Sequence, residues 1–128
     1  MRLLLDTYAF FWFIDGSDRM PPSVAASIEA SAGSVHVSIA SLWEMAIKVG
    51  LGRWPEAAGI LSEFEYLMEV GHFLPLAISP PHIRLATSIA SAHRDPFDRL
   101  LAAQARVEGL TLVTTDPAFT TLGADTLW

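Results

Sequence analysis

Short apolar runs alternate along the chain with longer segments in which apolar residues recur every three or four positions. Three of the runs, residues 3–5, 35–37 and 111–115, are rich in leucine, valine or threonine and are bounded by polar positions, which is typical of buried strands. Two weaker strands are expected at residues 73–76 and 125–127. The apolar runs therefore predict a set of short strands spread over the whole chain.

The segments between these runs carry the start and stop signals of helices. An Asp, Ser or Pro residue precedes most of them, and a glycine follows several, as N-caps, first-turn prolines and C-terminal glycines do. The segment 58–70 has the apolar spacing of an amphipathic helix. We expect helices at residues 7–14, 22–32, 39–49, 58–70, 80–90 and 96–108, and a last short helix from Pro117.

Strands that alternate with helices favour an α/β fold, in which a short central parallel sheet is flanked by helices on both faces. No repeat, low-complexity tract or long linker interrupts the chain, so residues 1–128 are expected to form a single domain. Ligands of such sheets bind beyond the carboxyl ends of the strands. The residues that follow the strands are therefore the first candidates for a functional site.

The composition limits the chemistry available to this domain. Hydrophobic residues make up 52% of the chain and charged residues 17%, which predicts a packed core and an apolar surface for a second subunit or a partner. The absence of cysteine excludes disulfides, thiolate zinc sites and cysteine nucleophiles, and favours an intracellular, cytoplasmic location. The first apolar run ends after three leucines and none is long enough to span a bilayer, so no signal peptide or membrane segment is expected.

The charge balance is acidic. The chain has 8 Lys and Arg residues against 14 Asp and Glu residues, a formal net charge of −6. Binding of nucleic acid through a broad basic face is therefore excluded, because that mode depends on clustered Lys and Arg side chains that replace counterions. Any activity on nucleic acid needs another source of positive charge.

Three carboxylates lie where a predicted strand ends or a helix begins. Asp6 and Asp116 directly follow strands, and Asp98 lies in the first turn of the helix that leads into the strand before Asp116. Each could be a helix cap or first-turn acid, and Asp95 is best interpreted as an N-cap. If the two strands are parallel neighbours, however, the three acids meet at one edge of the sheet, where their like charges require a cation. Oxygen ligands alone favour Mg²⁺ or Mn²⁺ over Zn²⁺.

The remaining ionisable residues are weaker candidates. Glu44 lies in a helix too apolar for the surface, four residues before Lys48, so an i,i+4 ion pair and a place in the acidic site are both open. Arg99 is the candidate for a phosphate contact, whereas Arg94 is expected to be a solvated charge. No histidine has metal-ligand spacing, and those outside the predicted strands are expected on the surface or in loops: His72, His82 and His93.

Four segments carry motifs that occur together in a known family. They are residues 3–7 (LLLDT), 41–48 (SLWEMAIK), 93–105 (HRDPFDRLLAAQA) and 112–116 (LVTTD), of which the third is the most specific. Together they resemble the PIN-domain ribonucleases, and in particular the VapC-type toxins of type II toxin–antitoxin pairs. The resemblance covers essentially the whole chain. It departs at Tyr8, where relatives often have histidine, and at Thr115, where they often have a basic or polar residue.

The resemblance implies a PIN fold and a metal-dependent ribonuclease. Its acidic metal-binding set would be Asp6, Glu44, Asp98 and Asp116, which would hold one or two Mg²⁺ or Mn²⁺ ions for hydrolysis of an RNA phosphodiester. Accessory contacts are expected from Asp95, Thr7, Ser38, Ser41 and Thr114. The implied partners are the RNA substrate, a cognate antitoxin that keeps the enzyme inactive, and a second copy of the chain in a homodimer.

Two other functions remain open from the sequence. In an aspartyl-phosphate phosphotransfer domain Asp6 would be the nucleophile, although haloacid-dehalogenase-type enzymes have a second aspartate where this chain has Tyr8. In a non-catalytic protein-interaction module the acidic residues would be helix caps and the apolar excess an interface. The nucleophile elbow of serine hydrolases and the glycine-rich phosphate loops are absent from the sequence.

Overall fold

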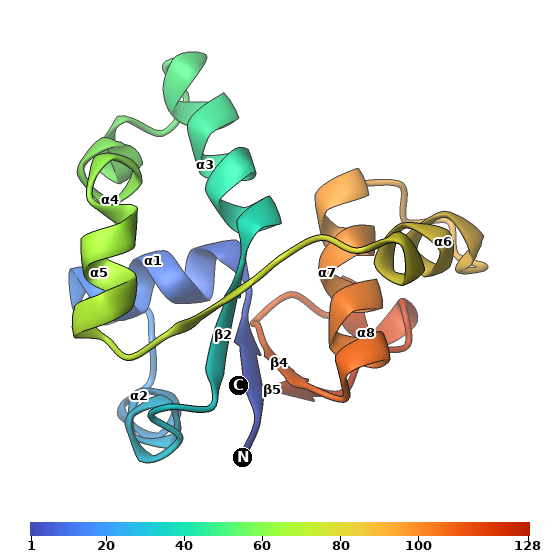
Figure 1. Ribbon diagram of the computed structural model, residues 1–128, viewed down its shortest axis with the longest axis horizontal. Helices are drawn as coiled ribbons and strands as arrows, with labels where there is room; N and C mark the ends of the chain where they lie inside the picture. Colours follow the sequence, from blue (N-terminus) through green and yellow to red (C-terminus); the bar gives the residue numbers. More distant parts are fainter.

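The structure, a computed structural model that describes residues 1–128, is built on one five-stranded sheet (Figure 1). The strand order is β3-β2-β1-β4-β5, and every neighbouring pair is parallel. The strands are β1 (Leu3–Leu5), β2 (Val35–Ser38), β3 (Leu74–Leu76), β4 (Thr111–Val113) and β5 (Thr126–Leu127). The fully buried strand β1 therefore lies at the centre of the molecule, with a neighbour on each side.

Helices cover both faces of this sheet. They are α1 (Thr7–Asp15), α2 (Pro22–Ala30), α3 (Ile39–Gly50), the 3₁₀ turn η1 (Pro55–Ala57), α4 (Ala58–Ser62), α5 (Phe64–Val70), α6 (Pro80–Ser88), α7 (Pro96–Glu108) and α8 (Ala118–Thr121). Because successive side chains of a strand point to opposite faces, Leu3 and Leu5 enter a core with α1 to α5, and Leu4 enters a second core with α7 and α8. The predicted α/β fold is confirmed. None of the helices is both long and apolar enough to cross a bilayer.

The helix expected over residues 58–70 is interrupted at Glu63, so the expectation of one continuous helix is wrong. Glu63 has φ −110° and ψ 21°, outside helical values, and α4 ends before it while α5 begins after it. Ile60 and Phe64, on either side of the break, both enter the main core, where the rings of Phe64 and Phe10 lie 6.0 Å apart. The local helix signal therefore holds on each side of Glu63 but not across it.

Three other elements end two residues earlier than predicted: α2 stops at Ala30 instead of residue 32, and in β4 and α6 side chains bind backbone groups at the end of the element. β4 stops at Val113 instead of continuing to residue 115, and the Thr114 hydroxyl then accepts a hydrogen bond from the Asp116 N–H (3.1 Å). α6 stops at Ser88 instead of residue 90, where the Arg99 guanidinium binds carbonyl groups at the end of the helix. Both side chains lie close to the predicted acidic site.

His82 is buried, with 1% of its surface exposed, so its expected place on the surface or in a loop is wrong. It is the third residue of α6, where its Nδ1 accepts from the Ser79 N–H (3.1 Å) in a capping box. Its Nε2 lies 2.9 Å from Oε1 of Glu108 at the end of α7. The ring is buried because it joins these two helices, which pack against each other.

Candidate metal centre

The pairing of β1 and β4 brings two of the predicted acids to the same edge of the sheet. Leu5 is paired with Val113, so Asp6 and the segment that leads to Asp116 leave the sheet as neighbours. The Asp6 N–H donates to the Val113 carbonyl (3.1 Å), and the Asp6 carboxylate caps α1 by accepting from the Ala9 N–H at 2.7 Å. The parallel neighbours on which convergence of these acids depends are therefore present.

One cavity of about 160 Å³ gathers all four acids of the predicted set. They come from four separate parts of the chain: the end of β1, the middle of α3, the first turn of α7 and the loop after β4. The lining consists of Asp6, Glu44, Asp98 and Asp116 together with Asp95, Thr7, Tyr8, Lys48, Leu101 and Phe119. Residues far apart in the sequence thus meet in one acidic cavity.

Asp6 is buried in this cavity and forms no salt bridge. Burial raises its pKa from the ordinary 3.8 to about 6. Hydrogen bonds from Thr114 and from the Ala9 N–H act against this rise, and the negative charges of Asp98 and Glu44 add to it. A cation bound near Asp6 would therefore stabilise its ionised carboxylate, which is shielded from water and has no ion-pair partner in the protein.

His93 holds Asp98, a role that the sequence analysis missed. Its Nε2 lies 2.8 Å from Asp98 Oδ2. Burial raises the pKa of Asp98, the hydrogen bond and charge of His93 lower it, and the charges of Asp95 and Glu44 raise it further. His93 lies in the loop before α7, as expected, but its ring contacts the acidic cluster. Its place at the start of the most specific motif was the one signal that pointed to it.

Glu44 belongs to the cavity and also forms the ion pair that its spacing predicts. Lys48 Nζ lies 2.9 Å from Glu44 Oε2, and Thr7 Oγ1 lies 2.6 Å from Glu44 Oε1 and 3.0 Å from Ser41 Oγ. Burial lowers the pKa of Lys48, but the hydrogen bond and charge of Glu44 more than offset this and leave it above its ordinary value. Both oxygens of Glu44 are therefore held by the chain, in the cavity instead of on an exposed face.

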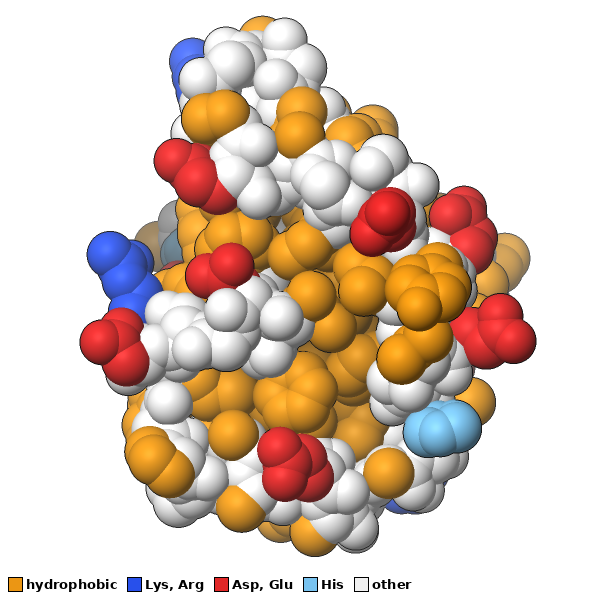
Figure 2. Space-filling model, turned by 90° about the vertical axis from the view of Figure 1, so that its left-hand side faces the viewer, with side chains coloured by type: hydrophobic (Ala, Val, Ile, Leu, Met, Phe, Trp, Pro, Cys, Tyr) orange, Lys and Arg blue, Asp and Glu red, His pale blue; other side chains and the backbone are white.

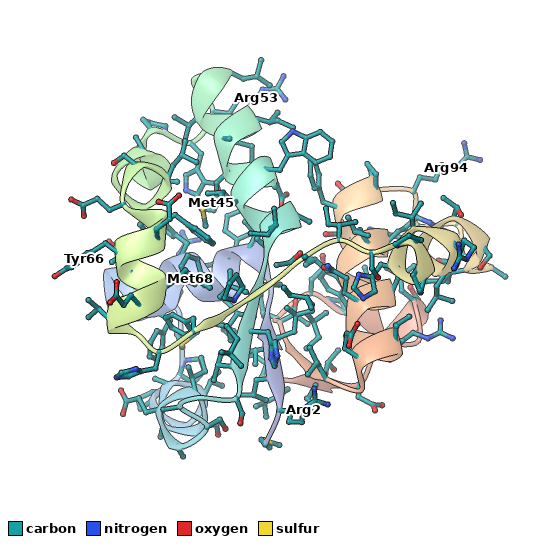
Figure 3. The ribbon with its side chains drawn as sticks, in the orientation of Figure 1. Arg2, Met45, Arg53, Tyr66, Met68 and Arg94 are labelled. Carbon is teal, nitrogen blue, oxygen red and sulfur yellow. The ribbon has the colours of Figure 1, made fainter.

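Arg99 binds the backbone, which does not favour its predicted contact with a phosphate. Its guanidinium donates to the carbonyls of Ala86 (2.8 Å), His93 (2.8 Å) and Ile89. It thereby ties the end of α6 and the loop of His93 to the first turn of α7. Arg94 is exposed and points away from the body of the protein, as expected of a solvated charge (Figure 3).

The remaining predicted residues divide between the cavity and the scaffold. Asp116 is exposed and accepts from the Ala118 N–H (2.9 Å). Asp95 is also exposed and caps α7, since its Oδ1 accepts from the N–H groups of Phe97 (2.9 Å) and Asp98 (3.0 Å). Ser38, Ser41 and Thr114 do not line the cavity, and the Ser38 hydroxyl donates instead to buried Gln104 Oε1 at 2.6 Å.

The donor set fits a hard cation such as Mg²⁺, although no three Asp, Glu or His side chains are close enough to hold an ion jointly in this geometry. All four acids offer oxygen, and the raised pKa of Asp6 marks a shortage of positive charge. Mg²⁺ usually keeps several waters and takes only one or two carboxylates directly, so a spread cluster can bind it through water. The site therefore suits Mg²⁺ or Mn²⁺ in its chemistry.

Comparisons with known proteins agree with this fold. No curated protein matches the chain, and the solved structures that resemble it share the fold at low sequence identity. VapBC2 from Rickettsia felis bound to a promoter DNA fragment has a TM-score of 0.72 at 18% identity, over 99% of this chain and 98% of that one. DNA-bound VapBC from Salmonella typhimurium has a TM-score of 0.71 at 14% identity, over 99% of this chain and 97% of that one. FitAcB from Neisseria gonorrhoeae has a TM-score of 0.66 at 20% identity, over 98% of this chain and 96% of that one. The model of the PIN domain family matches residues 3–124, and the chain therefore belongs to that family.

Proposed function

We propose that this protein is a ribonuclease that hydrolyses RNA phosphodiester bonds with Mg²⁺ or Mn²⁺, and that it acts as a VapC-type toxin. The observation that carries the proposal is the meeting of four carboxylates from four parts of the chain in one cavity of about 160 Å³. Helix caps alone do not require such a meeting, because like charges brought together destabilise a fold. Membership of the PIN domain family supports the same activity.

The four acids, Asp6, Glu44, Asp98 and Asp116, would hold the cation. When bound, a divalent cation supplies an activated water and stabilises the charge that develops on the phosphate. The chain orients its own ligands: Asp6 Oδ1 is fixed by the Ala9 N–H, Glu44 by Thr7 and Lys48, and Asp98 Oδ2 by His93.

Lys48 is the one cation among the residues that line the cavity. Its ammonium group is partly exposed and lies against Glu44 and the ring of Tyr8. We infer that it attracts the RNA phosphate toward the carboxylates, which by themselves would repel it. An acidic protein can in this way approach nucleic acid without a broad basic face.

Cleavage of RNA in Mg²⁺, Mn²⁺ and EDTA tests the proposed function. We expect the wild-type protein to cleave single-stranded RNA in Mg²⁺ or Mn²⁺ and not in EDTA, and Asp6→Asn and Asp98→Asn to lose at least about 100-fold in rate. The matched control is Asp18→Asn, which changes an exposed aspartate in a loop outside the cavity. Full cleavage by either cavity variant, or in EDTA, would exclude the proposed mechanism.

We propose that the antitoxin docks in an apolar groove. Hydrophobic side chains gather, with acidic side chains around them, on the side of the molecule that carries α4 and α5 (Figure 2). A groove of about 460 Å³ between α3, α5 and β3 is lined by Ile39, Leu42, Phe64, Met68, Phe73 and Pro75, with Glu65 and Glu69. Its apolar lining and acidic rim favour a segment with an apolar face and basic flanks.

Substitution of a residue in the groove tests whether the antitoxin binds there. Ile39 is 37% exposed, so Ile39→Glu should leave the fold intact but prevent co-purification with the cognate antitoxin. Val107→Glu is the matched control, because Val107 is 43% exposed on α7 and does not line the groove. Equal capture of both variants would place the partner elsewhere. Light scattering of the free protein tests the proposed homodimer, for which exposed apolar residues such as Val70 provide surface.

A further inference from the structure

A second cavity of about 360 Å³ lies beside the acidic one, and Tyr8 lines both. Its walls are aromatic, from Tyr8, Phe11, Trp12 and Trp54, and its polar lining residues are Asp15, Ser17, Arg19 and Glu56. We call it the aromatic hollow. Its volume falls within the roughly 300–1,000 Å³ typical of small-ligand sites. None of the proposed catalytic steps uses it, and Lys48, which lines the acidic cavity, lies against two of its rings.

The aromatic rings of the hollow form a continuous layer that starts at the acidic cavity. Tyr8 lies 4.7 Å from Trp54 between ring centroids, at 32°, and 5.8 Å from Trp12, one helical turn away on α1, at 40°. Phe11 packs edge-on against Trp54 at 5.0 Å. Tyr8 is 42% exposed, and Trp12 and Phe11 are partly exposed, although rings of this size are usually covered. The layer therefore offers open ring surface to a flat partner.

Two cations lie against this layer. Lys48 Nζ is 5.1 Å from the centre of the Tyr8 ring and 5.8 Å from that of Trp54, on the side of the acidic cavity. Arg19 Cζ is 5.9 Å from the Trp12 ring. Aromatic rings interleaved with cations are the combination that binds single-stranded nucleic acid, in which bases stack and phosphates pair with charge.

We propose that the aromatic hollow is a nucleobase subsite, which binds a base of single-stranded RNA next to the phosphate that is cleaved. The proposal rests on the proposed ribonuclease function. A base stacks on Tyr8 and Trp12, its exocyclic groups meet Asp15 and Glu56, and the following phosphate meets Arg19. Bases inside a duplex are not open to such stacking, so the subsite selects unpaired RNA. The lining of the hollow mixes aromatic and polar residues, whereas the groove at α3 and α5 is mainly apolar. The groove is therefore better suited to a protein segment, and the hollow to a base.

Binding of single-stranded hexa-adenylate RNA, measured by fluorescence anisotropy, tests the subsite. All proteins carry Asp98→Asn so that the RNA stays intact. We expect Tyr8→Ala to raise the Kd about tenfold, and Tyr8→Phe, which keeps the ring, to change it less than twofold. Tyr66→Ala is the matched control, since Tyr66 is 63% exposed on α5 and points away from the body of the protein (Figure 3).

Arg19→Ala keeps the test decisive if Tyr8→Ala folds poorly, because the exposed Arg19 side chain is not needed for the core. We expect this variant to raise the Kd about threefold and to reduce the slope of log K against log salt by about 0.7, the loss of one phosphate contact. An unchanged RNA affinity in both variants would overturn the proposal. Unchanged RNA affinity with weaker capture of the antitoxin would assign the hollow to a protein partner and would also overturn it.

The two proposals fail in different ways. If the ribonuclease function is wrong, the wild-type protein does not cleave RNA in Mg²⁺. If only the subsite is wrong, wild type and Tyr8→Ala cleave the same single-stranded RNA with equal KM. The subsite predicts instead a KM about tenfold higher in Tyr8→Ala, with a smaller change in kcat.

Discussion

Asp6 combines two roles that place opposite demands on one carboxylate. As the N-cap of α1 it is held by the Ala9 N–H and by the positive end of the helix dipole, which favour its ionised form. As a member of the acidic cavity it lies beside Asp98 and Glu44 and out of water, which disfavours that form. The pKa of about 6 shows that burial and like charge prevail in the absence of a cation.

Stability in EDTA should therefore fall as the pH rises from about 4 to about 7. The pKa of Asp6 is about 6 in the folded protein and 3.8 in an unfolded chain, so the folded state binds this proton more tightly. Its contribution to stability is fully present below pH 3.8 and is lost as the pH rises through 6, a loss of about 3 kcal/mol. Urea unfolding at several pH values should show a smaller loss in Asp6→Asn. Equal pH slopes would contradict the raised pKa.

His93 should act on metal binding through Asp98, which it holds at 2.8 Å. We expect His93→Ala to weaken Mg²⁺ binding about tenfold, because the carboxylate loses the contact that orients it. His93→Gln, which retains a donor, should recover most of the affinity in isothermal titration calorimetry. His72→Asn is the control, since His72 is exposed, outside the cavity, and has a φ of 55° that Asn tolerates. Wild-type affinity in His93→Ala would remove His93 from the site.

At the scale of elements, α7 organises the site more than any other helix. Its first turn supplies Asp98 and the Arg99 guanidinium that fixes the preceding loop. Its middle supplies the buried Gln104, which accepts from Ser38 at the end of β2 and donates to the Ala77 carbonyl. The helix is thus anchored to the sheet below the acids that it presents.

Asp95 caps α7, and its substitution tests whether it has this structural role alone or also binds the proposed metal. Asp95→Ala should lower the free energy of unfolding by about 1 kcal/mol, because the N–H groups of Phe97 and Asp98 lose their acceptor. Asp95→Asn, which can still cap, should restore most of this stability in urea unfolding. Mg²⁺ affinity should change less than about threefold in either variant. A loss of affinity as large as that of Asp98→Asn would make Asp95 a metal ligand.

At the scale of the whole molecule, binding of the proposed metal in the acidic cavity would be coupled to folding. The fold brings together four carboxylates that an unfolded chain keeps apart, so a cation held by them would bind the folded state and not the unfolded one. The formal net charge of −6 does not itself provide this coupling, because most of the acidic residues are outside the cavity. What matters is the local concentration of charge.

Mg²⁺ should accordingly raise the melting temperature. At 100 times its Kd the ion adds about 2.7 kcal/mol, which corresponds to about 10 °C for a domain of this size. Differential scanning fluorimetry in MgCl₂ and in NaCl of equal ionic strength checks this shift and removes the general effect of salt. Glu44→Gln should abolish most of it. An equal shift in NaCl would support the non-catalytic interpretation of the acidic residues.

The sequence by itself determined the features that depend on near neighbours along the chain. Strands such as β1, the caps Asp6 and Asp95, and the acids that follow strands were predicted because apolar runs and capping residues act over a few positions. Asp6, Asp98 and Asp116 were identified by their positions at strand ends and in the first turn of a helix, and their meeting depended on one topological condition, the pairing of β1 with β4. The resemblance added Glu44, whose spacing alone left an ion pair equally open.

Only the tertiary structure decided which distant partners each side chain meets. The burial of His82, the break at Glu63, the backbone contacts of Arg99 and the hydrogen bond of His93 to Asp98 depend on how helices pack against one another. No short-range signal encodes these contacts, because the segments that make them are positioned by the shared core and by the sheet. The same packing places Tyr8 between the acidic cavity and the aromatic hollow, where an isolated helix would leave it in water.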